Sequence, residues 1–390
     1  MRSLFHAVRK TYLFLCVVLP LLFALGGITA CDEEFDHPLP GEGFEPYNLL
    51  VRTFTQVVYI RLNGHSAEIY GPAANLVDYT ISTQKLSGHG IAETDSTTSA
   101  VTHIQIKSEQ QGIAYFVYGS IVPTIDKATS MDCQYYGNIT LDSSSDYALY
   151  LNNARLQSHQ GPAFESRGEG DCYLVLCNGS KNAFSDSEDY TDHIDSPACV
   201  CVLGDLYFDG LGSLSIRSKG IISATDSLYT HALQAFGVTC AYDIKAQFSA
   251  LGDALHLTDS DATIKRGTWE LTAGRNALYS SAGNIYLDGG ILSGVAQHGS
   301  FVSTQGDYGF AVDSALCFGA SALPSAVGNI SPQIIRQQYV DSLVLRPDTM
   351  VSAYVGNNKI ASLTPRCRLA APCLLLSSPG LTESDSISFR

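Results

Sequence analysis

A spacing of about 22 residues recurs through the middle of this chain, and it limits the possible folds more than any other feature. Five segments begin with Ala after a loop residue and continue as a short apolar strand: Ala163-Phe164, Ala198–Val202, Ala232-Leu233, Ala254–Leu257 and Ala277–Tyr279. The last three alanines are 22 and 23 residues apart, and the earlier intervals are 35 and 34 residues. Between most of these alanines lie a second strand, a Gly-containing turn and a third strand, so the typical unit has three short strands.

Three short strands in about 22 residues is the period of a parallel β-helix, in which coils stack and alternate side chains point into a narrow core. A β-propeller is the main alternative, but its blades need about 40–45 residues and four antiparallel strands. The longer intervals indicate insertions at Ser185–Asp195 and around Ile221–Thr230, which we expect on one side of the stack. We therefore predict an all-β chain built on a parallel β-helix.

Composition and strand pattern divide the rest of the chain. Residues 1–30 read as an export signal, and residues 31–45 as a tether rich in acid, Pro and Gly. Residues 46–130 hold strands without the 22-residue period, and we expect them to form an N-terminal β cap or the first coils. The parallel β-helix is predicted over 131–330, followed by a small β module or cap over 331–390.

The N-terminus has the pattern of a lipoprotein signal. The first ten residues carry three basic side chains and no acid, and residues 11–30 are uncharged. A membrane-spanning anchor is the alternative, but Pro20 and Gly26-Gly27 interrupt the run and leave it short of the roughly 20 apolar residues that a spanning helix prefers. Ile28-Thr29-Ala30-Cys31 resembles the lipobox of bacterial lipoproteins, which implies a membrane anchor through lipid on Cys31.

An acidic run, Asp32-Glu33-Glu34, follows directly. It resembles the surface-export signal of Bacteroidota-type lipoproteins, and this implies attachment to the outer membrane with the protein exposed at the cell surface. An ordinary solvated tether is the alternative, and it would leave the protein facing the periplasm.

Charge excludes one class of partner. The chain has 38 acidic and 23 basic side chains, a formal charge of −15. We expect no nucleic-acid binding, because phosphate contacts need clustered Lys and Arg. Only 16% of the residues are charged while 45% are hydrophobic, so the chain can bury a large core and is not a disordered acidic protein.

Several segments between Tyr147 and about Gly299 match a known family. Leu149–Ala154 is like its "LxLNG" strand, Leu174–Asn182 like its "xVxLxDGTxN" turn, Gly212–Ile216 like its "GSLTI", and residues 376–388 like its terminal "SSPxL" segment. The chain thereby resembles the carbohydrate-binding-domain lipoproteins of Bacteroidota, relatives of a clostridial cellulose- and pectin-binding β-helix family. The resemblance implies a right-handed parallel β-helix, extracellular polysaccharide binding, and calcium ions between coils.

Calcium is a possible cofactor in this interpretation. The family often carries runs of paired Asp, whereas this sequence offers the single acids Asp253, Asp259, Asp261 and Asp288. The first three lie within nine residues, and calcium needs several converging oxygen ligands. The loop 186–195 is a second candidate, and solvated loop acids are the alternative interpretation of both.

Sugar binding needs exposed aromatic faces, because a pyranose ring has an apolar face and a rim of hydroxyls. The candidates in or near consecutive coils are Tyr207, Trp269, Tyr279 and Tyr286. Alternatively, these rings terminate stacks of core side chains.

The function that these features predict is an exported, lipid-anchored protein that binds polysaccharide of the acidic or plant type without catalysis. A calcium-dependent polysaccharide lyase is the first alternative, with Lys265, Arg266 and Arg275 as the basic residues near the acidic cluster. A structural or adhesive surface protein with no sugar ligand is the second. The scattered histidines show no ligand spacing in the sequence.

Overall fold

The computed structural model describes residues 48–49, 52–85, 100–119, 135–187, 190, 195, 197–223, 228–324, 326–327, 335–341, 343–379, 381–382 and 384–390. All of them belong to one compact unit, Pro38–Arg390. The predicted signal 1–30, Cys31 and the tether 31–45 lie outside the described residues. Within the described part of the chain, no helix is both long enough and apolar enough to cross a bilayer.

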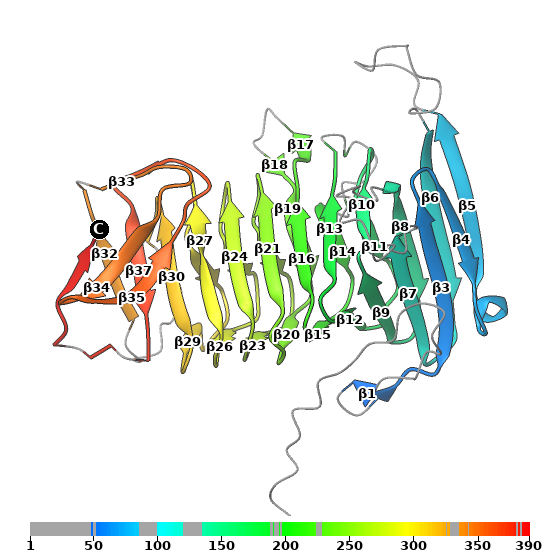
Figure 1. The fold of residues 1–390 in the computed structure, drawn as a ribbon, viewed down its shortest axis with the longest axis horizontal. Helices are drawn as coiled ribbons and strands as arrows, with labels where there is room; N and C mark the ends of the chain where they lie inside the picture. The colour runs from blue at the N-terminus through cyan, green and yellow to red at the C-terminus, as the bar shows by residue number, and fades with distance from the viewer. Residues whose placement is uncertain are drawn as a thin grey trace, which may run out of the picture. The chain divides into compact units, whose positions relative to one another are not determined.

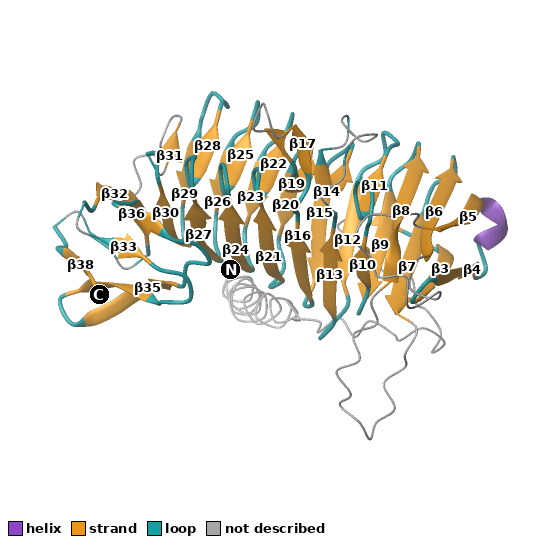
Figure 2. Cartoon of the chain, turned by 90° about the horizontal axis from the view of Figure 1, so that it is seen from above, coloured by secondary structure: helices purple, strands orange, loops and turns teal. Residues whose placement is uncertain are grey.

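The all-β prediction is confirmed, and most strands belong to three large sheets, which we call sheets I, II and III (Figures 1 and 2). Sheet I consists of β3 (Gln56–Asn63), β4 (Ser66–Tyr70), β7 (Ile113–Gly119), β9 (Tyr147–Asn152), β12 (Cys172–Leu176), β15 (Leu206–Gly210), β20 (Val238–Cys240), β23 (Ala262–Ile264), β26 (Ile285–Leu287) and β29 (Phe310–Val312).

Sheet II consists of β5 (Asp78–Lys85), β6 (Ala100–Ser108), β8 (Tyr135–Ser143), β11 (Phe164–Ser166), β14 (Ala198–Val202), β19 (His231–Ala235), β22 (Leu255–Leu257), β25 (Leu278–Ser280), β28 (Val302–Thr304) and β31 (Ala326–Val327). The parallel strands of sheet III are β10 (Arg155–Gln157), β13 (Lys181–Ser185), β16 (Ser213–Arg217), β21 (Lys245–Ala250), β24 (Thr268–Ala273), β27 (Ile291–Ala296) and β30 (Leu316–Ser321). β8 pairs with strands of both, β11 in sheet II and β10 in sheet III.

The repeat seen in the sequence is also the repeat of strand pairing. The chain visits sheet II, sheet I and sheet III in turn, as in β22, β23 and β24, and then repeats this order in β25, β26 and β27. These strands pair in parallel with their counterparts, and the register joins Leu255 to Leu278, Ala262 to Ile285 and Thr268 to Ile291. All three pairs are 23 residues apart, so one repeat advances each sheet by one strand.

The repeated alanines are fully buried, as expected for small side chains at a tight inner corner. Ala232, Ala254 and Ala277 follow the common register, and Ala163 aligns with Cys199. Ala198 does not belong to this column, because it pairs with His231. The expectation of five equivalent alanines is therefore wrong by one residue in β14, where Cys199 fills the small-residue position.

Alternation of side chains along the strands builds the core. In β24, Trp269, Leu271 and Ala273 point inward and are buried, whereas the threonines and Glu270 between them are more accessible. Buried residues from all three sheets form one continuous cluster. Gly210, with φ of 89°, ends β15 where an added Cβ would lie 2.1 Å from the Leu176 carbonyl oxygen, so this turn requires glycine.

Antiparallel strands lie at both ends of the repeat. At the N-terminal end β4 pairs with β3 and β5 pairs with β6, and one helical turn, η1 (Ala74–Leu76), lies between β4 and β5. At the C-terminal end, β37 (Cys373–Ser377) pairs antiparallel with β30 and with β32 (Ile335–Tyr339). At both ends the antiparallel strands therefore cover the outermost parallel strands, which protects these sheet edges from pairing with another chain.

The remaining strands are short or belong to the C-terminal part. They are β1 (Asn48–Leu49) with β2 (Arg52–Thr53), β17 (Ile221–Ser223) with β18 (Leu228–Tyr229), β33 (Val344–Leu345) with β36 (Leu369–Ala370), and β34 (Val351–Val355) with β35 (Asn358–Leu363) and β38 (Ile387–Phe389). The C-terminal strands enclose a second apolar cluster that includes Leu345, Ala353 and Leu374.

Both insertions lie between sheet III and sheet II and are joined by one buried carboxylate. Asp186, 3% exposed, accepts hydrogen bonds from Tyr190 Oη at 2.8 Å, Ser218 Oγ at 2.6 Å and the Lys219 backbone N–H at 2.7 Å. Burial raises the pKa of Asp186 to about 6, although these hydrogen bonds oppose the shift. The carboxylate thus holds the first insertion against the segment that leads into the β17–β18 hairpin.

The charge on Asp186 makes stability depend on pH. Its folded pKa lies above the 3.8 of an unperturbed carboxyl, so between these values the folded protein keeps a proton that the unfolded chain has released. The contribution of Asp186 is therefore greatest below about pH 4, falls as the pH rises to about 6 and then stays constant. Wild type should therefore lose stability over this range while Asp186→Asn does not. Urea unfolding should show the free energy of unfolding of wild type falling by about 2 kcal/mol, relative to that of Asp186→Asn, between pH 4 and pH 7. Asp195→Asn, at an exposed acid of the same insertion, is the control, and parallel curves for wild type and Asp186→Asn would contradict the assignment.

Candidate functional site

The predicted aromatic residues lie on different faces of the protein. Tyr207 and Tyr286 share one outward column of sheet I, with Thr239 and Thr263 between them in the register. Neighbouring strands are about 4.8 Å apart, so the two rings are separated by roughly 14 Å along the sheet. Tyr207 stacks on Tyr173 with ring centroids 4.7 Å apart, and Tyr286 is half-buried.

Trp269 does not meet the requirement for a sugar platform. Its side chain is 0% exposed, and it packs edge-to-face against Phe208 and Phe248 at centroid distances of 5.3 and 5.9 Å. The prediction is wrong for this residue, because strand alternation places Trp269 on the inner side of sheet III. Tyr279, in contrast, is half-buried on the outer side of sheet II, next to His256.

The four acids predicted to bind calcium do not gather into one set of ligands. Asp253 is buried, whereas Asp259, Asp261 and Asp288 are exposed on other turns. Asp261 accepts hydrogen bonds from the backbone N–H and the side-chain amide of Asn284, at 2.6 and 3.1 Å. In the part of the chain that the structure describes, no three of these carboxylates offer oxygens to a common point. The expected convergence is wrong, because Asp253 and Asp261 precede strands of two different sheets.

The outer side of sheet III carries a group of cations, which we call the cationic face: Lys181, Arg217 and Lys245. Lys181 and Lys245 share a column through Ser213, about 10 Å apart, and Arg217 lies four residues beyond Ser213, or about 13 Å along β16. All three are exposed. Glu270 lies next to Gln247 in the neighbouring column of this face. It accepts hydrogen bonds from Arg366 and Gln247 and is therefore already paired. This face is therefore positively charged in a chain whose formal charge is −15.

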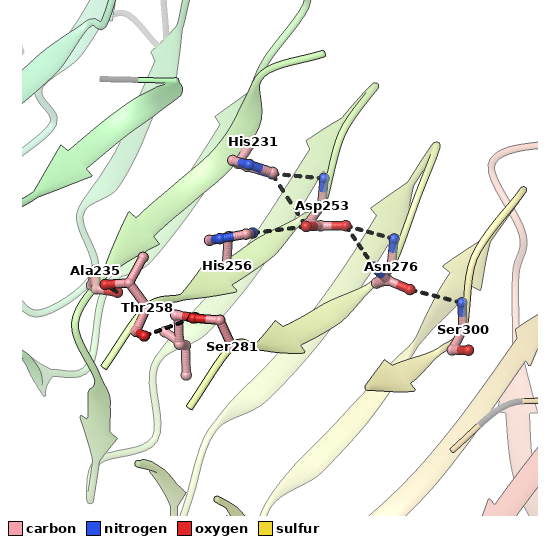
Figure 3. A network of polar contacts seen from close by, with 9 residues as sticks. His231, Ala235, Asp253, His256, Thr258, Asn276, Ser281 and Ser300 are labelled. Carbon is pink, nitrogen blue, oxygen red and sulfur yellow. Dashed lines mark hydrogen bonds and ion pairs between the residues drawn. The ribbon is translucent and has the colours of Figure 1, made fainter. Parts of the chain in front are cut away.

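The described residues bring together one group of three potential metal ligands, His231, Asp253 and His256, whose donor atoms lie within 4.8 Å of one another. Asp253 Oδ2 is 2.8 Å from His256 Nδ1 and 3.4 Å from His231 Nδ1. The backbone N–H and side-chain amide of Asn276 both donate to Asp253 Oδ1, at 2.8 and 3.0 Å. Figure 3 shows both imidazole rings on one side of the carboxylate and Asn276 on the other.

The hydrogen bonds assign the protons in this network. The backbone N–H of Asp253 donates to His231 Nδ1 at 3.0 Å, so that nitrogen carries a lone pair and the proton of neutral His231 sits on Nε2. Burial lowers the pKa of His231 to about 3, and neighbouring His256 adds to this effect. Burial alone would raise the pKa of Asp253, but the hydrogen bonds from His256 and from the Asn276 backbone N–H hold it below its usual value.

The geometry of the two rings argues against a metal centre. The centroids of His231 and His256 are 4.0 Å apart with 27° between the ring planes, so the rings are stacked. In-plane lone pairs of stacked rings run side by side, whereas two ligands of one zinc ion must point at a common position about 2.0–2.1 Å away. His231 Nδ1 is also already occupied by the Asp253 backbone N–H. The arrangement fits an oriented hydrogen-bond network.

The sequence pattern contained a signal for this group that spacing between histidines did not reveal. His231 and Asp253 are 22 residues apart and occupy equivalent positions in the register of β19 and β22. His256 follows three residues after Asp253, at an outward position of β22. Residues one coil apart are neighbours in a stacked repeat, so a search at the 22-residue period would have paired them. The usual ligand spacings of a few residues do not apply here.

Comparison with known proteins identifies one matching family. Residues 133–306 match the model of a carbohydrate-binding domain-containing protein. No curated protein matches the chain. Among solved structures, the chain is similar to a polysaccharide lyase-like protein from C. thermocellum, in a gadolinium derivative, with 14% sequence identity and a TM-score of 0.41 over 70% of this chain and 97% of the other.

Proposed function

We propose that this protein binds polysaccharide of the acidic or plant type through the outer surfaces of a right-handed parallel β-helix, without catalysis. The match to a carbohydrate-binding domain spans residues 133–306, which contain most of the stacked repeats. The parallel pairing of corresponding strands in three sheets supports the β-helix. A stacked repeat offers long outer surfaces along which an extended polymer can lie.

The observation that carries this proposal is the cationic face. Lys181, Arg217 and Lys245 are exposed, and none of them forms an ion pair with an acid among the described residues. Uronate groups repeat along acidic polysaccharides, and cations spaced about 10 to 14 Å apart can attract several of them at once. The hydroxyl and amide groups of Ser213, Ser215 and Gln247 on the same face add hydrogen-bonding partners for sugar hydroxyls.

The proposal also includes export and a lipid anchor. The sequence of residues 1–31 supports a signal peptide followed by lipid attachment at Cys31, and Asp32-Glu33-Glu34 supports display at the outer surface of the outer membrane. As contacts for sugar rings we retain Tyr207, Tyr279 and Tyr286, whose rings lie on the outer sides of sheets I and II. Trp269 is not included.

Binding to polygalacturonate tests the proposal. We expect wild-type protein to be retained on the polymer, and the triple variant Lys181→Gln, Arg217→Gln, Lys245→Gln to bind about tenfold more weakly, since three exposed charge contacts of about 0.5 kcal/mol each are lost. Affinity should also fall with added salt, because exposed charges are screened. Affinity electrophoresis and equilibrium pull-down measure both effects.

A matched triple variant provides the control. Lys265, Arg346 and Lys359 are exposed basic residues outside the cationic face, and their replacement by Gln removes the same charge with little expected loss of binding. An equal loss of affinity in both triple variants would mean that binding depends only on net charge, and it would contradict the cationic face as the binding site. Growth of ultraviolet absorbance from unsaturated products would instead indicate a lyase, and retention that disappears in EDTA would indicate calcium.

A further inference from the structure

We propose that His256 and Tyr279 form a second subsite, which binds an uncharged sugar ring on the outer side of sheet II. His256 Nε2 accepts a hydrogen bond from a ring hydroxyl, and the Tyr279 ring packs against the sugar. The inference rests on the proposed function, because it names a further place where the same kind of ligand binds. It differs from the cationic face in its position, its residues and its ligand charge.

Four hydrogen-bonding side chains follow one another in an outward column of sheet II. The register places Gln234, His256, Tyr279 and Ser303 on successive strands, about 4.8 Å apart. The preceding member of the column, Cys201, is 0% exposed, whereas Gln234, His256 and Tyr279 are half-buried. The column is therefore accessible from Gln234 to Tyr279 and is buried again at Ser303, which is 8% exposed.

Asp253 fixes the orientation of His256. The carboxylate accepts the Nδ1–H of His256 at 2.8 Å, which leaves the lone pair of His256 on Nε2, the ring nitrogen that does not face Asp253. Asn276 holds the other carboxylate oxygen, and the His256 ring lies between His231 at 4.0 Å and Tyr279 at 5.0 Å. The acceptor is thus held in place before a ligand arrives, which lowers the entropic cost of binding.

The stacking of coils does not by itself require His256. His231, Asp253 and Asn276 each accept a hydrogen bond from the backbone N–H of the aligned residue one coil on, a ladder that ends at Ser300. These hydrogen bonds satisfy backbone N–H groups at the corner between sheets III and II. All of them would still form without an imidazole at position 256. His256 instead adds a side chain, 18% exposed, whose second nitrogen makes no hydrogen bond with a described residue.

The surroundings select a neutral ring. Nε2 of His256 presents a lone pair, and the Asp253 carboxylate lies directly behind the ring. Neither group attracts a uronate carboxylate, and none of the four side chains in the column is Lys or Arg. Arg275 is the basic residue that acts on this network, and its charge lowers the pKa of His231. A hydroxyl, which donates a hydrogen bond and carries no charge, is the matching partner for His256.

Titration calorimetry with neutral hexasaccharides built from glucose, xylose, mannose or galactose tests the subsite. We expect wild type to bind at least one of them, and His256→Leu and Tyr279→Ala each to bind it about tenfold more weakly. His256→Gln, which restores an acceptor near the Nε2 position, should recover most of the affinity. Tyr279→Phe keeps the ring and should stay within about twofold of wild type.

Controls separate this inference from the proposed function. His298→Ala removes an exposed histidine from a different turn and should leave binding unchanged, and Gln234→Ala probes the column at a residue that does not touch Asp253. Equal affinity of wild type and His256→Leu, with both folded, would overturn the subsite alone. Binding of polygalacturonate with no neutral oligosaccharide bound would also overturn it and leave the proposed function intact. Failure to bind any of these glycans would remove both.

Discussion

Replacing Trp269 with alanine is expected to lower the free energy of unfolding by about 3–5 kcal/mol, the largest effect of any substitution we propose. The side chain is 0% exposed and lies between Phe208 and Phe248, with both ring pairs edge-to-face. Its indole N–H donates to the Arg266 carbonyl oxygen at 3.3 Å, so the polar atom is also satisfied. Alanine would leave a cavity in the inner side of sheet III that adjacent coils cannot close, because their backbone spacing is fixed by the ladder of hydrogen bonds.

Chemical unfolding followed by tyrosine fluorescence and circular dichroism measures this effect. Tyr286→Ala is the matched control, because it removes a large ring from the outer side of a neighbouring sheet and should cost about 1 kcal/mol or less. A stacked repeat can unfold in steps, so the two signals must coincide before a single free energy is extracted. A Trp269→Ala variant as stable as Tyr286→Ala would contradict the assignment of Trp269 to the core.

Removing the carboxylate at position 253 is expected to cost about 3 kcal/mol, the second largest effect. Asp253→Ala deprives the Asn276 backbone N–H, the Asn276 side-chain amide and His256 Nδ1–H of their common acceptor. Asp253 is 1% exposed, so water has little access to replace it. An unmet buried donor costs about 1–3 kcal/mol, and several donors lose their partner together.

The neighbouring ladder contains a close control for this substitution. Asp261 makes the same pair of hydrogen bonds to Asn284 that Asp253 makes to Asn276, but Asp261 is exposed. Asp261→Ala should therefore cost about 1 kcal/mol or less, since water can satisfy the released donors. The difference between the two variants, measured by urea unfolding at pH 7, isolates the effect of burial and of the histidines. Equal losses would mean that the His231–Asp253–His256 network adds nothing to stability.

Much of the fold was predictable because its determinants are local. Three short strands in about 22 residues predicted the parallel pairing now seen at an interval of 23 residues in all three sheets. The insertions after β13 and β16 were visible as longer intervals between alanines. Trp269 was misassigned although alternation in β24, with threonine and glutamate on either side, already indicates an inward ring. Aromatic composition was the wrong guide there, and strand alternation was the right one.

The candidate site was less predictable because it depends on register between coils. The acids Asp253 and Asp261 are close in sequence, yet a turn directs them to different sheets. Conversely, Lys181 and Lys245 are 64 residues apart in the chain and share one column of the cationic face. Residues close in sequence can therefore lie apart in the structure, and residues far apart in sequence can be neighbours, because neighbours on an outer surface come from successive coils.

The sequence by itself determined the all-β character, the period of the repeat and, in alternating strands such as β24, the side that faces the core, because alternation and turn residues act within a few positions. Only the tertiary structure decided which outward side chains meet. Gln234, His256 and Tyr279 keep the 22- or 23-residue period, but the insertions lengthen the interval earlier in the chain, so the column that joins Lys181, Ser213 and Lys245 at 32-residue steps follows from hydrogen-bonded register and not from that period. The orientation of His256 depends further on Asp253, a residue placed beside it by the corner between two sheets.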